Sequence, residues 1–193
     1  WTKLGRQTAT SGSVKPLAII LANDKMKTIT MKNLTLIILI FANVYSQNKY
    51  SPNFSTIISA NNGLVMLNQC SRSTPENING FFELAKNDIE QLEENFKNIY
   101  SLKSTKCCYA KKKIQNLENF AFQYIGVNIN NEKYIYINAL GFSNSDEVDE
   151  SKPFFKNWKT LPISVCDGGS SYWGVLYNIR KKKFSQLSIN GSI

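Results

Sequence analysis

The spacing of hydrophobic residues changes along the chain, and the change separates a predicted helix from predicted strands. Between about Pro75 and Tyr100 the apolar residues recur every three or four positions, which places them on one side of a helix. These residues are Ile78, Phe81, Ala85, Ile89, Leu92, Phe96 and Ile99. The pattern therefore predicts one long amphipathic helix over this stretch.

The following region alternates with a period of two and is rich in aromatic and β-branched residues, as strands are. The predicted strands are Phe120–Ile129, Lys133–Phe142, Ser171–Ile179 and Phe184–Ile189. Asn130 and Asn131 separate the first two strands and Arg180–Lys183 separates the last two, so each pair is expected to form a hairpin. The predicted fold class is α+β, one long helix packed on a four-stranded antiparallel sheet, and this layout resembles cystatin-like or NTF2-like proteins.

A secretory signal peptide is predicted at Met26–Ser46. Lys27 and Lys32 supply the positive start, Leu34–Ala42 forms a short apolar core, and the polar residues that follow favour cleavage before Gln47. The apolar core is shorter than the roughly 20 residues that a membrane span needs, so the mature protein is expected to lack such a span. A buried core helix is the alternative, but such a helix is amphipathic and this segment is apolar on all sides.

Removal of the predicted signal peptide and of the residues before it lowers the net charge of the protein. Residues 1–25 precede the signal peptide and are expected to be upstream sequence that is not native to the protein. The whole chain has a net charge of +9, whereas residues 47–193, the predicted mature single domain, hold 17 basic and 13 acidic residues, a net charge of +4. That value is ordinary for a small domain, and therefore a nucleic-acid partner is not expected.

All four cysteines, Cys70, Cys107, Cys108 and Cys166, fall in the predicted mature domain. In an oxidising compartment they are expected to form disulfides. A bond between the neighbouring Cys107 and Cys108 requires a strained ring, so we expect Cys70 and Cys166 each to pair with one of these two. No metal site is predicted, because the chain has no histidine and no Cys-x-x-Cys spacing.

The absence of histidine also limits catalysis. Ser-His-Asp and Cys-His sites are excluded as self-contained sites because their general base is missing. A carboxylate pair, a lysine base or a metal held by oxygen ligands stays open, but no spacing singles out a catalytic residue, and no cofactor is predicted.

The segment Cys166–Gly174 is the most unusual local sequence. Its simplest interpretation is a turn before a strand, because glycines that follow an aspartate favour tight turns. The functional interpretation is a weak binding site, with exposed backbone amides beside a polar side chain and two aromatic rings. Its candidate residues are Asp167, Gly168, Gly169, Tyr172 and Trp173. The stretch Asp167–Gly191 also resembles the tail of small exported bacterial proteins of uncharacterised function, a resemblance that implies no activity.

Two basic runs, Lys111–Lys113 and Arg180–Lys183, suggest an anionic surface as partner if they lie together in space. Solvated charges are the simpler interpretation of each run, and of the acidic stretch around Asp146–Glu150, which lacks the ligand order of an EF-hand. Asn53 and Asn190 begin Asn-x-Ser motifs, which are glycosylation acceptors in a eukaryotic secretory pathway.

The preferred functional hypothesis is an exported, secreted or periplasmic, non-enzymatic binding module for a protein, peptide or glycan. The alternatives are a carboxylate-dependent hydrolase and a binder of anionic surfaces.

Overall fold

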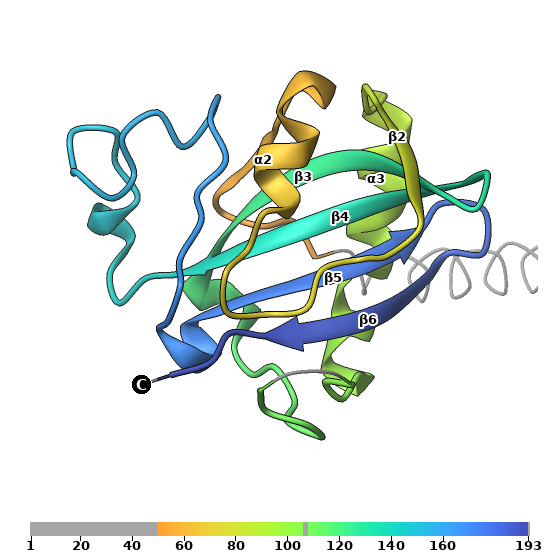
Figure 1. Cartoon of the computed structure of the whole chain (residues 1–193). Helices are drawn as coiled ribbons and strands as arrows, with labels where there is room; N and C mark the ends of the chain where they lie inside the picture. Colours follow the sequence, from red (N-terminus) through yellow and green to blue (C-terminus); the bar gives the residue numbers. More distant parts are fainter. Residues whose placement is uncertain (1–49, 106–107, 193) are drawn as a thin grey trace, which may run out of the picture. The chain divides into compact units, whose positions relative to one another are not determined.

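The computed structural model describes residues 50–105 and 108–192, which Figure 1 draws in colour. The predicted signal peptide, Met26–Ser46, and the preceding residues 1–25 lie outside the described residues. No helix within the described part of the chain is long and apolar enough to cross a membrane.

Six strands form one mixed sheet in the described residues. They are β1 (Ser55–Ile57), β2 (Ile78–Phe82), β3 (Phe120–Ile129), β4 (Glu132–Gly141), β5 (Tyr172–Asn178) and β6 (Lys183–Ile189). The order is β1-β3-β4-β5-β6, and β2 pairs with β3 further along the edge that β1 also uses. Only β1 runs parallel to its neighbour, so the fold is α+β, but its sheet is larger than the four antiparallel strands expected.

Both predicted hairpins are confirmed. Asn130 and Asn131 form the β3–β4 turn with positive φ angles of 49° and 63°, a conformation that asparagine tolerates better than most residues. The turn pairs Ile129 with Glu132, and the register then continues without interruption to the pair Phe120 and Gly141. The β5–β6 hairpin forms as expected, with a register shift near Gly174.

The single long helix predicted over residues 75–100 is wrong. The first part of this stretch is β2, and the rest is α3 (Lys86–Asn95) followed by the 3-10 helix η2 (Phe96–Ser101). Asn77 and Gly80 have φ angles of 57° and 155°, which interrupt a helix, and the register of β2 on β3 shifts between Ile78 and Gly80. The helix therefore starts only after Ala85, whose N–H donates to the carboxylate of Asp88 over 3.0 Å.

One face of the sheet, which we call the apolar face, packs against α3 and η2. Leu92, Phe96 and Ile99 from these helices are fully buried against alternate residues of β3 to β6. Phe96 lies at the centre, with its ring centroid 4.9 Å from that of Phe122 and 6.2 Å from that of Phe184. The helical spacing of these apolar residues was predicted, and it forms the main core of the protein.

The opposite face, which we call the mixed face, is covered by the short helix α2 (Gly63–Leu67) and by the long segment between β4 and β5. Figure 1 shows α2 and α3 on opposite sides of the sheet. Met66 of α2 packs in one apolar cluster with Ile125 and Leu176, and Trp158 of the long segment packs in another with Leu140.

A row of buried polar side chains separates these two clusters. We call Arg72, Gln123, Asn138 and Asn190 the polar row; all four side chains are buried. Gln123 and Asn138 are direct partners on β3 and β4, and the Asn138 amide donates to the Gln123 carbonyl over 3.0 Å. The guanidinium of Arg72 donates to Asn138 (2.5 Å), Asn190 (3.0 Å) and the hydroxyl of Tyr136 (3.0 Å).

The polar row holds the irregular segment before β5 on the sheet. Gln123 donates to the carbonyls of Trp158 and Leu161, and its own carbonyl accepts the N–H of Ile163. Asn138 donates to the carbonyl of Ile163 over 2.8 Å. Buried backbone N–H and C=O groups that do not pair with a neighbouring strand need other hydrogen-bond partners. Here the side-chain amides of Gln123 and Asn138 supply them.

Cys70 and Cys166 form a disulfide bond across the mixed face, with their Cα atoms 4.9 Å apart. The expected pairing of each with Cys107 or Cys108 is therefore wrong. The polar row explains the observed bond, because its amides hold the segment before β5 against the same face on which Arg72 is anchored. Cys108 is not a free thiol, and Cys107 lies outside the described residues.

Candidate functional site

A cavity of about 610 Å³ opens at the end of the sheet where β3 begins, β4 ends and β5 begins. The antiparallel register brings these strand ends together, since Phe120 pairs with Gly141 and Leu140 pairs with Tyr172. Gly141 permits close packing here, because a Cβ at this position would lie 2.7 Å from the carbonyl oxygen of Ser171. The volume lies within the range of ordinary ligand-binding pockets.

Neutral hydrogen-bonding side chains line much of this cavity. They are Gln115, Asn116, Asn119, Ser143, Ser170 and Ser171. Amides and hydroxyls both donate and accept hydrogen bonds, so such a wall matches a ligand that carries hydroxyl or amide groups. Phe142 and Tyr172 contribute aromatic surface to the same cavity.

Tyr172 is held in place by contacts on several sides. Gly168 has a φ angle of 87°, and a Cβ there would lie 2.5 Å from the Tyr172 ring, so glycine allows the ring to rest on the backbone. Phe154 meets the ring edge-on, with centroids 6.0 Å apart. Burial, and then the charge of Glu147, raise the pKa of Tyr172, so the phenol stays protonated and is able to donate a hydrogen bond at neutral pH.

Of the five predicted binding residues, two line the cavity. Gly168 and Tyr172 line the cavity, whereas Asp167 is half-exposed and is not part of the cavity wall. The Gly169 residue is buried and its N–H donates to the carbonyl of Gly191 over 3.0 Å. Trp173 points to the apolar face and is fully buried there, so its ring belongs to the core.

The first basic run contributes two side chains to the cavity, Lys112 and Lys113. The Lys112 ammonium lies 4.7 Å from the centroid of the Tyr109 ring, a cation–π distance. Within the described residues, no salt bridge joins Lys111, Lys112 or Lys113 to an acidic group. Glu147 is the acidic residue that lines the same cavity, and one of its oxygens accepts the backbone N–H of Ser143 over 3.0 Å.

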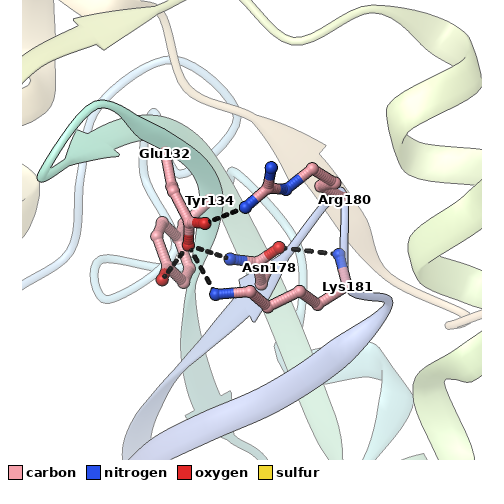
Figure 2. A network of polar contacts seen from close by, with 5 residues as sticks. All are labelled: Glu132, Tyr134, Asn178, Arg180 and Lys181. Carbon is pink, nitrogen blue, oxygen red and sulfur yellow. Dashed lines mark hydrogen bonds and ion pairs between the residues drawn. The ribbon is translucent and has the colours of Figure 1, made fainter.

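The second basic run is paired with an acid. Figure 2 shows Glu132, the first residue of β4, with dashed lines from its carboxylate to both Arg180 and Lys181. Its carboxylate contacts both side chains, at 2.9 Å from the Lys181 ammonium, and also accepts from Tyr134 (3.1 Å) and Asn178 (3.0 Å). The hydrogen bond from Lys181 is the main cause that lowers the pKa of Glu132 to about 2, so this run is partly neutralised inside the protein.

The two basic runs lie at opposite ends of the sheet. Glu132 begins β4 beside the second run, and Gly141 ends β4 at the cavity. A strand of 10 residues separates its ends by roughly 30 Å. This distance exceeds the Debye length of about 8 Å at physiological salt, so the runs do not act as one cationic patch.

A second cavity, of about 420 Å³, is lined by Asp146, Asp149 and Glu150 together with Trp158 and Lys159. Glu150 forms a 3.0 Å ion pair with Lys159. Hydrogen bonding from Ser151 lowers the pKa of Asp149. A lowered pKa favours the ionised form of Asp149, whereas a catalytic acid requires a raised pKa. No group of three or more potential metal-ligating side chains occurs among the described residues.

Sequence reasoning missed much of the cavity wall. Asn116 and Asn119 were not singled out, although Asn116 has a positive φ of 52°, and the only sequence signal nearby was the run of lysines before it. The polar row was also missed, because Gln123 and Asn138 lie inside predicted strands and a polar residue there is ordinarily expected to face water.

The chain was also compared with known proteins. No protein-family model, curated protein or solved structure matches it.

Proposed function

We propose that the protein is an exported, non-enzymatic binding module that holds a polar ligand, a glycan or a peptide, in the cavity at the end of β4. The observation that carries this proposal is the composition of the cavity wall. It combines amide and hydroxyl side chains with an aromatic ring, and Glu147 is the one carboxylate among the described residues that line it. Such a wall recognises a ligand by hydrogen bonds and offers no pair of carboxylates.

The hydrolase alternative has less support. Glycoside hydrolysis uses two carboxyl groups about 5 to 10 Å apart, of which the acid has a raised pKa. The larger cavity supplies one carboxylate, Glu147. The smaller cavity is lined by three, Asp146, Asp149 and Glu150, but the pKa of Asp149 is lowered and Glu150 forms an ion pair with Lys159. The geometry therefore favours binding over hydrolysis.

Export is part of the proposal and rests on the predicted signal peptide. The Cys70–Cys166 disulfide supports it, because disulfides persist mainly in oxidising compartments. The resemblance of Asp167–Gly191 to the tails of small exported bacterial proteins points the same way. Mass spectrometry of the secreted protein tests this directly: we expect a chain that begins at Gln47 and gains mass on reduction. A chain that stays inside the cell at full length would contradict export.

Protein NMR tests the binding site. We would titrate the ¹⁵N-labelled protein with a library of small saccharides and capped dipeptides. Hits are expected to shift the backbone amides of residues 141–143 and 168–172 and to leave residues 178–183 unchanged, since the latter lie at the other end of the sheet.

A matched pair of variants controls for a general effect of added apolar surface. Ser143 is exposed and lines the cavity, so Ser143→Trp places an indole in the ligand's space. Ser185 is exposed on β6 and does not line it, so Ser185→Trp adds the same ring elsewhere. We expect only Ser143→Trp to abolish the shifts. Shifts that are unaffected by Ser143→Trp, or a library without hits, would count against the cavity as a binding site.

A further inference from the structure

The two basic runs differ in their surroundings. Arg180 and Lys181 share the carboxylate of Glu132, whereas Lys112 and Lys113 line the cavity; like Lys182 and Lys183, they form no salt bridge within the described residues. Charges without an acidic partner keep their electrostatic attraction for an anionic ligand, and a concave wall strengthens that attraction. The cavity thus carries two positive charges against the one negative charge of Glu147, one of whose oxygens already accepts the N–H of Ser143.

The rest of the wall is suited to a polyhydroxylated ligand. Asn116, Asn119 and Ser170 offer both donors and acceptors, which sugar hydroxyls need because each hydroxyl also does both. Tyr172 offers an aromatic surface beside a phenolic donor, and aromatic rings of this kind pack against the C–H face of a sugar.

A nucleic acid fits these features less well. Binding of single strands uses several aromatic platforms along a continuous basic groove. Here the second basic run is roughly 30 Å away along β4, and Trp173 is buried in the core.

We propose that the ligand of this cavity is an acidic oligosaccharide. Its carboxylate lies against Lys112 and Lys113, and its hydroxyls bond to the amide and hydroxyl side chains that line the same cavity. This inference rests on the proposed function, because it names the ligand class of the same cavity.

Calorimetric titration of the protein with two matched probes tests the inference. The probes are a galacturonate trisaccharide and the same trisaccharide with its carboxylates methyl-esterified. We expect the acid to bind at least about tenfold more tightly than the ester, a difference of about 1.4 kcal/mol. Its affinity is expected to fall as salt is raised from 20 to about 150 mM, because exposed charges are screened.

Two double variants distinguish the contributions of the two basic runs to ligand affinity. Lys112→Gln with Lys113→Gln is expected to lower the affinity for the acid about tenfold or more and to leave the affinity for the ester unchanged. Lys182→Gln with Lys183→Gln removes the same charge from the other run and is expected to change neither affinity. All four lysines are exposed, so we expect both variants to fold, which thermal unfolding by circular dichroism checks.

The failures of the two proposals are distinguishable. Equal binding of acid and ester that Ser143→Trp abolishes would overturn the acidic ligand and support the cavity as a binding site. If neither trisaccharide binds, the oligosaccharide assignment is overturned. Hexaglutamate serves as a third probe, and its tighter binding at the same lysines would overturn the saccharide class in favour of an acidic peptide.

Discussion

The two faces of the sheet are covered in different ways. On the apolar face, helical residues such as Phe96 pack against rings of the strands, and the buried contacts are almost entirely hydrophobic. On the mixed face, an irregular segment crosses the sheet and is held by the polar row and by the Cys70–Cys166 disulfide.

This difference arises because a helix and an irregular segment differ in how far they satisfy their own backbone hydrogen bonds. A helix satisfies its N–H and C=O groups internally, so the surface beneath it needs only apolar side chains of the right shape. An irregular segment cannot do so, and the sheet must then supply directional hydrogen bonds from Gln123, Asn138 and Asn190. The comparison predicts that substitutions on the two faces fail for different reasons, which the following experiments examine.

The largest effect is expected on the apolar face. Phe96 is fully buried among aromatic rings, so Phe96→Ala removes a large apolar contact and leaves a cavity. We expect a loss of about 3 to 5 kcal/mol in the free energy of unfolding, measured by urea denaturation. Phe154→Ala is the control, because Phe154 is exposed and should cost well under half as much. Equal losses for the two variants would show that the burial of the ring does not determine its contribution to stability.

The disulfide of the mixed face comes next. It joins residues 96 positions apart in the sequence, so it restricts a long loop of the unfolded chain. Replacing Cys70 and Cys166 together by serine is expected to lower the free energy of unfolding by about 2 to 4 kcal/mol. If the double variant unfolds at the same urea concentration as the wild type, the polar row alone holds this segment.

The polar row itself is tested by Arg72→Met, which keeps the length of the side chain and removes its donors. The substitution leaves oxygens of Tyr136, Asn138 and Asn190 without their guanidinium partner. We expect a loss of about 2 kcal/mol and faster hydrogen exchange at the Ile163 amide, which bonds to the same row.

Arg72→Lys serves as the conservative variant for this test. An ammonium keeps the charge but lacks the planar fork that reaches three side chains, so an intermediate loss is expected. If Arg72→Met is instead as stable as the wild type, the buried charge is a cost that methionine relieves, as occurs when some buried ionic groups are replaced.

The smallest effect is expected where the mixed face meets solvent, at Glu132. Its pKa is lowered to about 2, so its ionised form stabilises the folded state above the unfolded pKa of about 4.3. This contribution falls as the pH drops through about 2. Glu132→Gln should therefore be less stable than the wild type at pH 7, and the two should converge near pH 2 in pH-dependent thermal melts. A difference that grows toward low pH would contradict this sign.

The four strands of the two hairpins, β3 to β6, were predictable because their sequence signals are local, whereas β1 and β2 were not predicted as strands. Alternate residues of Phe120–Ile129 point to opposite faces of the sheet, and the period of two in the sequence indicates this. Asn130 and Asn131 favour the turn geometry that the strands require. The period alone did not reveal that both faces of β3 are buried, because Gln123 is polar and still fully covered. Burial of a polar side chain depends on a distant segment, and periodicity contains no information on it.

The predicted helix was wrong in its first part because helical spacing alone does not exclude a strand. Ile78 and Phe81 fit the same spacing as Leu92 and Phe96, but they belong to β2, whose pairing with β3 is a long-range contact. Gly80, which follows an asparagine, was the local sign that a helix would not continue through this point.

The cavity could be predicted only in part. Gly168 and Tyr172 were identified from an unusual local sequence, and Lys112 and Lys113 from a run of charge. That the two segments meet depends on the register of β4 with β5 and on the route of the 112–120 stretch, which no short motif encodes. The predicted disulfide pairing failed for a similar reason, since the position of Cys166 is set by the polar row.

The burial of Asn190 has a consequence for making this protein in a host that attaches sugars to asparagine. Asn190 begins an Asn-x-Ser motif, but its amide nitrogen donates to the carbonyls of Val165 (2.6 Å) and Asp167 (3.2 Å) and is fully buried. A glycan attached to that nitrogen is incompatible with these bonds, so a chain modified there cannot complete its fold. Asn53 is exposed and accommodates a glycan, and therefore a correctly folded glycoprotein would carry sugar at Asn53 and none at Asn190.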